Sequence, residues 1–259
     1  MSSSPSQLGL KADVRRLLES PTRDRASRKL ARTLAGSLES LAAGGDAEAS
    51  TLLGALSLEI LGDGRAAMRW FSQAAQEADR EAIRSLGFMY ATGVAVRPDP
   101  VRAYELFSQA ADLGDPVAKF NLASQNIREE GQHFGLARTV SLLEDASAAG
   151  IVEAEARLGD LLAAAEFLDD ALRWYIRAAE HGHFGAMGVL ATAYRDGALG
   201  VVDPVLSLRW FLGMLSVGRG DGMSSALDLA RGLNDDQIRE AAVMAGAESF
   251  GEAIISTVR

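Results

Sequence analysis

One phrase recurs along the chain at a nearly constant interval. Residues 70–79 read WFSQAAQEAD, and residues 106–114 read LFSQAADLG thirty-six positions further on. The small residues that end the successive copies lie 36, 36, 32 and 36 residues apart. A period of this length is typical of repeats that bury their apolar side only against their neighbours. The bulky pairs that recur are Trp70-Phe71, Leu106-Phe107, Leu142-Leu143, Trp174-Tyr175 and Trp210-Phe211.

A second phrase lies between the copies of the first one. It has a small residue, a Leu four positions later and another small residue directly after that Leu. Such a helix side lets a second backbone approach closely, which offsets the cost of about 1 kcal/mol for a Gly inside a helix. Each repeat is therefore predicted to be a hairpin of helix A, with this phrase, and helix B, with the first one. The copies are Ala49–Gly54, Ala82–Gly87, Ala118–Ala123, Ala154–Gly159 and Ala186–Ala191.

Turn residues fall at the boundaries that the two phrases predict. In Gly114-Asp115-Pro116, Gly suits the left-handed position after a helix, Asp accepts backbone N–H bonds, and Pro fits the first turn of the next helix. We expect the same device at Asp99-Pro100 and Asp203-Pro204, and further N-caps at Asp46, Asp79 and Asp221.

The two phrases together resemble Sel1-like repeats, which are relatives of the tetratricopeptide repeat. The likeness covers about residues 46–233, with five clear repeats and a weaker sixth around Met223–Leu233. It implies an all-α fold, a right-handed α-solenoid of helical hairpins with capping helices at both ends. Repeat three departs from the pattern at Ala123 and Leu142, and repeat four is four residues short, which predicts a tighter turn between its helices.

The ends of the chain are expected to cap the repeats. Residues 1–9 are predicted to be disordered, and residues 10–45 to form N-terminal helices. An amphipathic helix over residues 24–43 would place Leu30, Leu34, Leu38 and Leu41 on one side. Residues 234–259 are predicted to form a capping helix, from a capping box at Asn234 to about Glu248, followed by an apolar tail that packs on the cap or on a second copy.

Composition and charge narrow the classes of function. The 48% hydrophobic residues include only 6% aromatic ones, which favours closely packed helices, and the absence of Cys excludes disulfides and thiolate metal sites. Residues 1–40 carry eight basic and four acidic residues, a net charge of +4, so the total of −9 leaves −13 for residues 41–259. An acidic body is a poor surface for nucleic acid. With no apolar leader and no membrane-spanning run, we expect a cytoplasmic protein without membrane insertion.

Catalytic and metal-binding patterns are not found in the sequence. His181-Gly-His183 has no third ligand nearby, His133 is isolated, and no nucleotide loop or nucleophile motif occurs. Trp70, Trp174 and Trp210 recur at one position of helix B, which predicts a core role rather than a ligand site. We therefore expect no enzyme, no cofactor and no metal.

The surface that we expect to bind a partner is the side of helix A that faces away from helix B. In tetratricopeptide relatives these positions lie two before, two after and five after the conserved Leu. Aromatic residues and Arg there are typical of binding hot spots. The alternative is that Phe88 and Phe120 fill gaps between neighbouring helices. The predicted contact residues are Arg84, Phe88, Phe120, Ser124, Arg128, Asp160, Thr192 and Arg195.

Two functions fit this surface. The first is an adaptor or scaffold that binds a partner protein in a concave groove lined by the A helices. The second is a dedicated inhibitor or immunity protein that neutralises a bacterial toxin or enzyme, since the acidic body would suit a basic target. A homodimer through the C-terminal tail is a further expectation.

Overall fold

Helices are the only regular elements in the part of the chain that the structure describes. This computed structural model describes residues 5–129, 135–218 and 220–259, without the side chains of Pro5 and Asp221. Contacts group the helices into two compact units, residues 1–125 and residues 126–259. We call them the N-terminal unit and the C-terminal unit. The predicted all-α fold, a solenoid of helical hairpins, is confirmed.

Two helices precede the repeats, α1 (Pro5–Glu19) and α2 (Arg25–Ala43). The prediction of disorder is wrong for residues 5–9, which form the start of α1, and residues 1–4 lie outside the described residues. Pro5 is compatible with a first helical turn, and burial of Val14 and Leu17 in the core of the N-terminal unit stabilises the helix. Asp24 caps α2 by accepting the backbone N–H of Ser27 at 2.8 Å.

A buried lysine fastens α1 to the first repeat. The Lys11 side chain is 3% exposed, and its Nζ donates to both carboxylate oxygens of Asp46 at 2.9 and 2.7 Å and to Glu48 at 2.7 Å. Asp46 also accepts the Ala49 N–H at 3.0 Å as the N-cap of the next helix. The Asp46 carboxylate therefore both binds the N-terminal cap and caps the first helix of the repeats.

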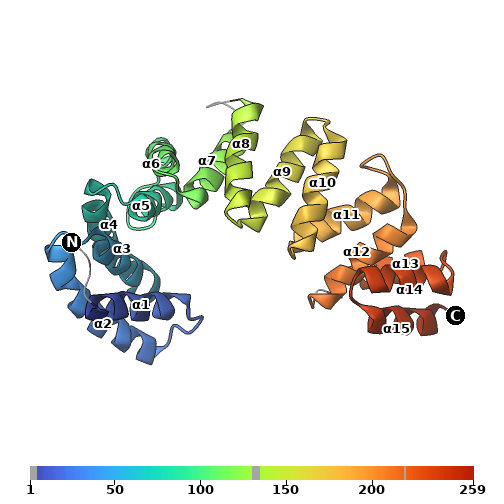
Figure 1. Cartoon of the computed structure of the whole chain (residues 1–259), viewed down its shortest axis with the longest axis horizontal. Coiled ribbons are helices and arrows are strands. Elements are labelled where there is room, and N and C mark those ends of the chain that lie inside the picture. Colours follow the sequence, from blue (N-terminus) through green and yellow to red (C-terminus); the bar gives the residue numbers. More distant parts are fainter. Residues whose placement is uncertain (1–4, 130–134, 219) are drawn as a thin grey trace. The chain divides into compact units, whose positions relative to one another are not determined.

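The hairpins of the N-terminal unit follow the predicted boundaries (Figure 1). Asp79, Asp99 and Asp115 accept backbone N–H groups at 2.7–2.9 Å and cap the helices that follow them, as predicted. The helices are α3 (Ala47–Ala55), its π-helical continuation Leu56–Leu61, α4 (Gly64–Gln76), α5 (Arg80–Thr92) and α6 (Pro100–Asp112), and α7 (Pro116–Arg128) crosses from one unit into the other.

The C-terminal unit continues the same alternation and ends in two capping helices. The predicted N-cap of α12 is confirmed, since Asp203 accepts the Leu206 N–H at 3.0 Å, whereas the side chain of Asp221 lies outside the described residues. The helices are α8 (Leu136–Ala148), α9 (Val152–Ala164), α10 (Leu168–Glu180), α11 (Phe184–Asp196), α12 (Pro204–Ser216), a 3-10 turn at Gly220–Gly222, α13 (Met223–Ala230), α14 (Asp235–Met244) and α15 (Glu248–Val258).

The C-terminal cap differs from the single helix that we predicted. The capping box at Asn234 and Gln237 is present, but α14 ends at Met244 instead of about Glu248, because Gly246 takes a left-handed φ of 61°. The apolar tail then forms α15, which packs on α13 and α14 with Ile254 buried. The tail thus packs on the cap, and the homodimer stays a prediction.

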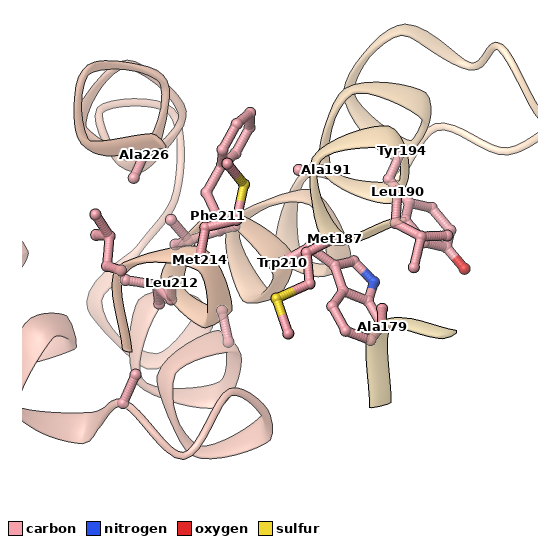
Figure 2. Packing of buried hydrophobic residues seen from close by; sticks show 14 of the residues in the cluster. Ala179, Met187, Leu190, Ala191, Tyr194, Trp210, Phe211, Leu212, Met214 and Ala226 are labelled. Atoms are coloured by element: carbon pink, nitrogen blue, oxygen red, sulfur yellow. The ribbon is translucent and has the colours of Figure 1, made fainter. Parts of the chain in front are cut away.

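Close approach of the two helices of a hairpin explains the small residue after the conserved Leu. A Cβ on Gly54, Gly87 or Gly159 would lie 2.5–2.8 Å from a ring atom of Phe71, Phe107 or Tyr175. The aromatic ring of helix B therefore lies directly on the backbone of helix A. Figure 2 shows the corresponding core of repeat five, where Phe211 of α12 packs between α11 and the Ala226 side of α13.

The predicted role of the three Trp residues is only partly confirmed. Trp210 is buried in the core of the C-terminal unit. Trp70 and Trp174, at the equivalent positions of other repeats, are half-buried. The buried position of helix B is the residue after the Trp, occupied by Phe71, Tyr175 and Phe211. Trp70 and Trp174 therefore lie at the edge of the core-facing side of helix B rather than at its centre.

The turns confirm the predicted roles of Gly and the shorter connection in repeat four. Gly114, Gly150, Gly182 and Gly218 have φ between 80° and 88°, and Ala78 takes the same left-handed region at φ 55°. Residues 165–167 join α9 to α10, whereas residues 93–99 and 197–203 make the corresponding turns of repeats two and five. Among the described helices, none is long and apolar enough to cross a membrane.

Candidate protein-binding surface

The outward side of α5 presents one large aromatic side chain. Leu86 and Gly87 face the core, and the residues two before, two after and five after Leu86 face away from it. Of these, Phe88 is 48% exposed and Ala91 is exposed, while Arg84 is half-buried. An exposed Phe costs solvation free energy and is a common anchor in protein interfaces. Phe88 is therefore the strongest contact candidate among the predicted residues.

Arg84 makes contacts within the chain that hold its guanidinium in place. Its Nη1 lies 3.0 Å from Asp115 Oδ2, and the Asp115 side chain is only 4% exposed. Asp115 also accepts the Ala118 N–H at 2.7 Å, so this carboxylate both caps α7 and binds the guanidinium from α5. Arg84 thus joins the A helices of two consecutive repeats, α5 and α7. Its contact with a partner stays a prediction.

The predicted positions on α7 are half-buried. Phe120 is partly covered, which is compatible with the alternative that it fills a gap between helices. The Ser124 hydroxyl oxygen is buried and has no hydrogen-bond partner in the described part of the chain. Arg128, in the last turn of α7, is exposed and belongs to the C-terminal unit.

In the C-terminal unit, Asp160, Thr192 and Arg195 are exposed but bonded within the chain. Asp160 accepts the Tyr175 hydroxyl at 2.9 Å, and burial together with this bond raises the pKa of Tyr175. Thr192 donates to the Gly188 carbonyl at 3.0 Å. Arg195 binds Asp196 through Nε and Nη2 at 2.7 and 2.8 Å, which raises the pKa of Arg195 and lowers that of Asp196.

The eight predicted residues divide evenly between the two units. Arg84, Phe88, Phe120 and Ser124 belong to the N-terminal unit, and Arg128, Asp160, Thr192 and Arg195 to the C-terminal unit. Each set is a candidate surface of its own unit.

Sequence reasoning missed a hollow of about 270 Å³ in the C-terminal unit, lined by residues of α10, α11, α12 and the end of α14. The Arg209 guanidinium carbon lies 4.3 Å from the centroid of the Trp210 ring, and Nη2 lies 3.6 Å from Glu180. Figure 2 shows the Trp210 ring beside Ala179 and Met187, which also line the hollow. An Arg precedes each repeat Trp, at Arg69, Arg173 and Arg209, and this dipeptide was the available signal.

Both described histidines have partners within the chain. His183 caps α11 by accepting the Ala186 N–H at 3.0 Å, and His181 Nδ1 lies 2.7 Å from Glu155 Oε2. Glu155 is buried and also binds Arg177 Nε at 2.7 Å and the Ser147 hydroxyl at 3.1 Å, so it joins α8, α9 and α10. Within the described residues, no group of three His, Asp or Glu could hold a metal ion, and His133 lies outside them.

Comparison with known proteins now identifies the repeats. The family model described as the Sel1 repeat matches residues 48–79, 80–115, 168–183 and 186–212. The chain contains four Sel1 repeats. Proteins built from such repeats mediate interactions between proteins. The matches omit repeat three, which departs from the pattern at Ala123 and Leu142.

Solved structures agree with this fold. A protective antigen of uropathogenic Escherichia coli that displays an SLR fold is 20% identical, with a TM-score of 0.73 over 97% of this chain. The chain spans 56% of the length of that protein. A Sel1 repeat protein from Oxalobacter formigenes is 25% identical over 83% of this chain and 91% of its own, with a TM-score of 0.63. Among curated proteins, none matches the chain.

Proposed function

We propose that this protein with Sel1 repeats is a non-enzymatic adaptor. It binds a segment of a partner protein on the side of its A helices that faces away from the B helices. Phe88 on α5 is the observation that carries the proposal, because it is a large aromatic side chain at 48% exposure on the side that faces away from the core. A partner that covers it gains the apolar burial that folding left unused. A cytoplasmic location belongs to the same proposal.

The contact is expected to combine Phe88 with its polar neighbours on the same side of α5. Thr92 lies one turn further along and is exposed, while Arg84 lies one turn earlier and is held by Asp115. A guanidinium fixed in this way keeps its position without a partner, which reduces the entropy lost on binding. An extended or helical segment with an apolar residue over Phe88 would suit this arrangement.

The test is a matched pair of alanine substitutions. A partner is first isolated with the full chain from its host, and its affinity is then measured by calorimetry. Phe88→Ala is expected to weaken binding by about 2 kcal/mol, which is roughly thirty-fold, as for a hot-spot aromatic. Val101→Ala is the control, since Val101 is 70% exposed on the second helix α6. Equal affinities of the wild type and Phe88→Ala would refute the proposed surface.

Charge supports the alternative of a dedicated inhibitor of a basic protein. Residues 1–125 contain 15 basic and 15 acidic residues, so the net charge of −9 belongs entirely to residues 126–259, with 11 basic and 20 acidic residues. Such a field would accelerate association with a basic toxin or enzyme at low salt. For this function, the isolated partner would be a basic enzyme that loses its activity when bound. A partner that stays active when bound points to the adaptor.

A further inference from the structure

Four cations form one side of α2 without a counter-ion. Arg25, Arg28, Lys29 and Arg32 follow the spacing of a single helix face and are all exposed. Within the described chain, none of the four side chains takes part in a recorded hydrogen bond or ion pair. Asp24 bounds the face at one end and Glu39 lies two turns beyond Arg32 at the other. We call these four residues the basic face.

The position of the basic face opposes the local preferences of a helix. The N-terminal turns of a helix favour acidic residues, because the helix dipole is positive there. The first turn of α2 has no acidic residue, and three of the four cations lie in its first two turns. Like charges one turn apart on a helix also repel each other. A feature that costs local stability without a structural return is expected where a binding site requires it.

An apolar hollow lies beside the basic face. It has a volume of about 450 Å³ between α1 and α2, and its wall includes Leu17, Leu30 and Leu34. Leu30, directly after Lys29, is 48% exposed. Ser20 and the Arg16–Asp13 ion pair complete the lining. The hollow belongs to the cap, outside the repeats and the surface of α5.

We propose that the basic face and this hollow together bind an acidic segment of another protein, with carboxylates on the cations and an apolar side chain against Leu30. Four cations within eight residues span about 10 Å of helix, which a short acidic segment matches. The leucines would add nothing for a phosphate backbone. The N-terminal unit as a whole is neutral and the remainder of the chain is acidic, so a long polyanion would gain little beyond these four charges.

The probe is a labelled, end-blocked peptide of about a dozen residues, two thirds Glu and one third Leu, titrated into the full chain at low salt. Arg28→Glu/Arg32→Glu is expected to weaken binding by about tenfold or more, because two attractive charges become repulsive. The matched control is Arg65→Glu/Arg69→Glu, which makes the same charge change at exposed positions with the same spacing on α4. This control should stay within about twofold of the wild type.

The apolar part of the site is tested separately. Leu30→Ser in the protein, or Ser in place of Leu in the peptide, is expected to weaken binding by about fivefold, the value of a partly buried Leu. Circular dichroism and thermal unfolding check that each variant is folded, which exposed substitutions should leave intact.

Five results would each overturn the proposal. They are no binding of the wild type to the peptide, equal losses in both charge variants, full affinity of the Ser-substituted peptide, tighter binding to a short DNA duplex or to phosphatidylserine vesicles, and self-association that the Arg28→Glu/Arg32→Glu variant abolishes. The last result would identify a second copy of this chain as the occupant. The test is independent of Phe88, so it can fail without affecting the proposed function.

Discussion

Gly159 shows how a single atom can decide whether two helices pack. The Tyr175 ring of α10 lies where a Cβ of residue 159 would be, and the Tyr175 hydroxyl is bonded to Asp160, the next residue of α9. The Tyr175 ring is thus held by packing on the Gly159 backbone and by the hydrogen bond of its hydroxyl to Asp160. The Gly costs about 1 kcal/mol in helix propensity, which the buried ring offsets.

Gly159→Ala is expected to lower the free energy of unfolding by about 1–3 kcal/mol, the usual cost of overpacking, as measured by urea denaturation. The new Cβ would lie 2.6 Å from two ring carbons of Tyr175. Gly36→Ala in α2 is the matched control, because nothing lies within 4 Å of its Cβ. It should instead raise stability by up to about 1 kcal/mol. A Gly159→Ala variant as stable as the wild type would show that the ring can move aside.

At the scale of elements, polar groups at helix ends fix the order of packing. Lys11 joins α1 to the start of α3, Arg84 joins α5 to the start of α7, and Glu155 joins α8, α9 and α10. In the first two contacts, the acceptor also caps the helix that begins there. These contacts stabilise one arrangement of neighbouring helices, which apolar packing alone would specify less strictly.

The Lys11 contact predicts a defined pH dependence. Burial lowers the pKa of Lys11, but the hydrogen bonds to Asp46 and Glu48 outweigh it, so the pKa is raised above 10.5. Burial likewise raises the pKa of each carboxyl group, and the bonds to Lys11 outweigh it and leave both below their usual 3.8 and 4.5. The contact therefore contributes fully to the free energy of unfolding at pH values between the ordinary pKa values of the carboxyl groups and that of lysine. It is lost as pH rises through the folded pKa of Lys11, or falls through those of the two carboxyl groups.

Lys11→Met is expected to lower the free energy of unfolding by about 1–3 kcal/mol near neutral pH, as for a partly buried ion pair that loses one partner. The difference from the wild type should shrink as the pH falls through the lowered pKa values of Asp46 and Glu48, and as it rises through the raised pKa of Lys11. Urea denaturation across this range measures it. Lys29→Met, an exposed lysine of α2, is the control and should change stability by less than about 0.5 kcal/mol. A difference that does not vary with pH would contradict the assigned ion pair.

At the scale of the whole chain, each repeat contacts chiefly its neighbours, and the contacts divide into two units. Stability in such a chain is close to a sum of local terms. A defect in one unit should therefore loosen that unit first.

Leu86→Ala and Leu190→Ala form a crossed test of this idea. Both Leu residues are buried at the same position of repeats two and five, and each substitution should cost about 2–5 kcal/mol. Hydrogen exchange should accelerate in α3–α6 for Leu86→Ala and in α10–α13 for Leu190→Ala. Uniform acceleration in both variants would show that the chain unfolds as one cooperative body.

The sequence alone determined the repeat, its hairpin form and most helix ends. A period of 36 residues, a Leu between small residues and an Asp before a Pro each correspond to a local physical preference. These preferences act over a few residues, or between neighbours of identical pattern, and are therefore readable without coordinates. The exposure of Phe88 could be predicted in the same way, because it follows from the distance of Phe88 to Leu86 along the helix.

Only the tertiary structure decided which polar groups meet, and that Trp70 and Trp174 are half-buried while the residue after each is buried. Arg84 and Asp115 are 31 positions apart, Lys11 and Asp46 are 35 apart, and no local pattern links them. The order of residues 5–9 likewise depends on the burial of Val14 and Leu17 further along α1. Such contacts arise between distant parts of the chain, where the stabilisation comes from desolvation and geometry that neither composition nor spacing records.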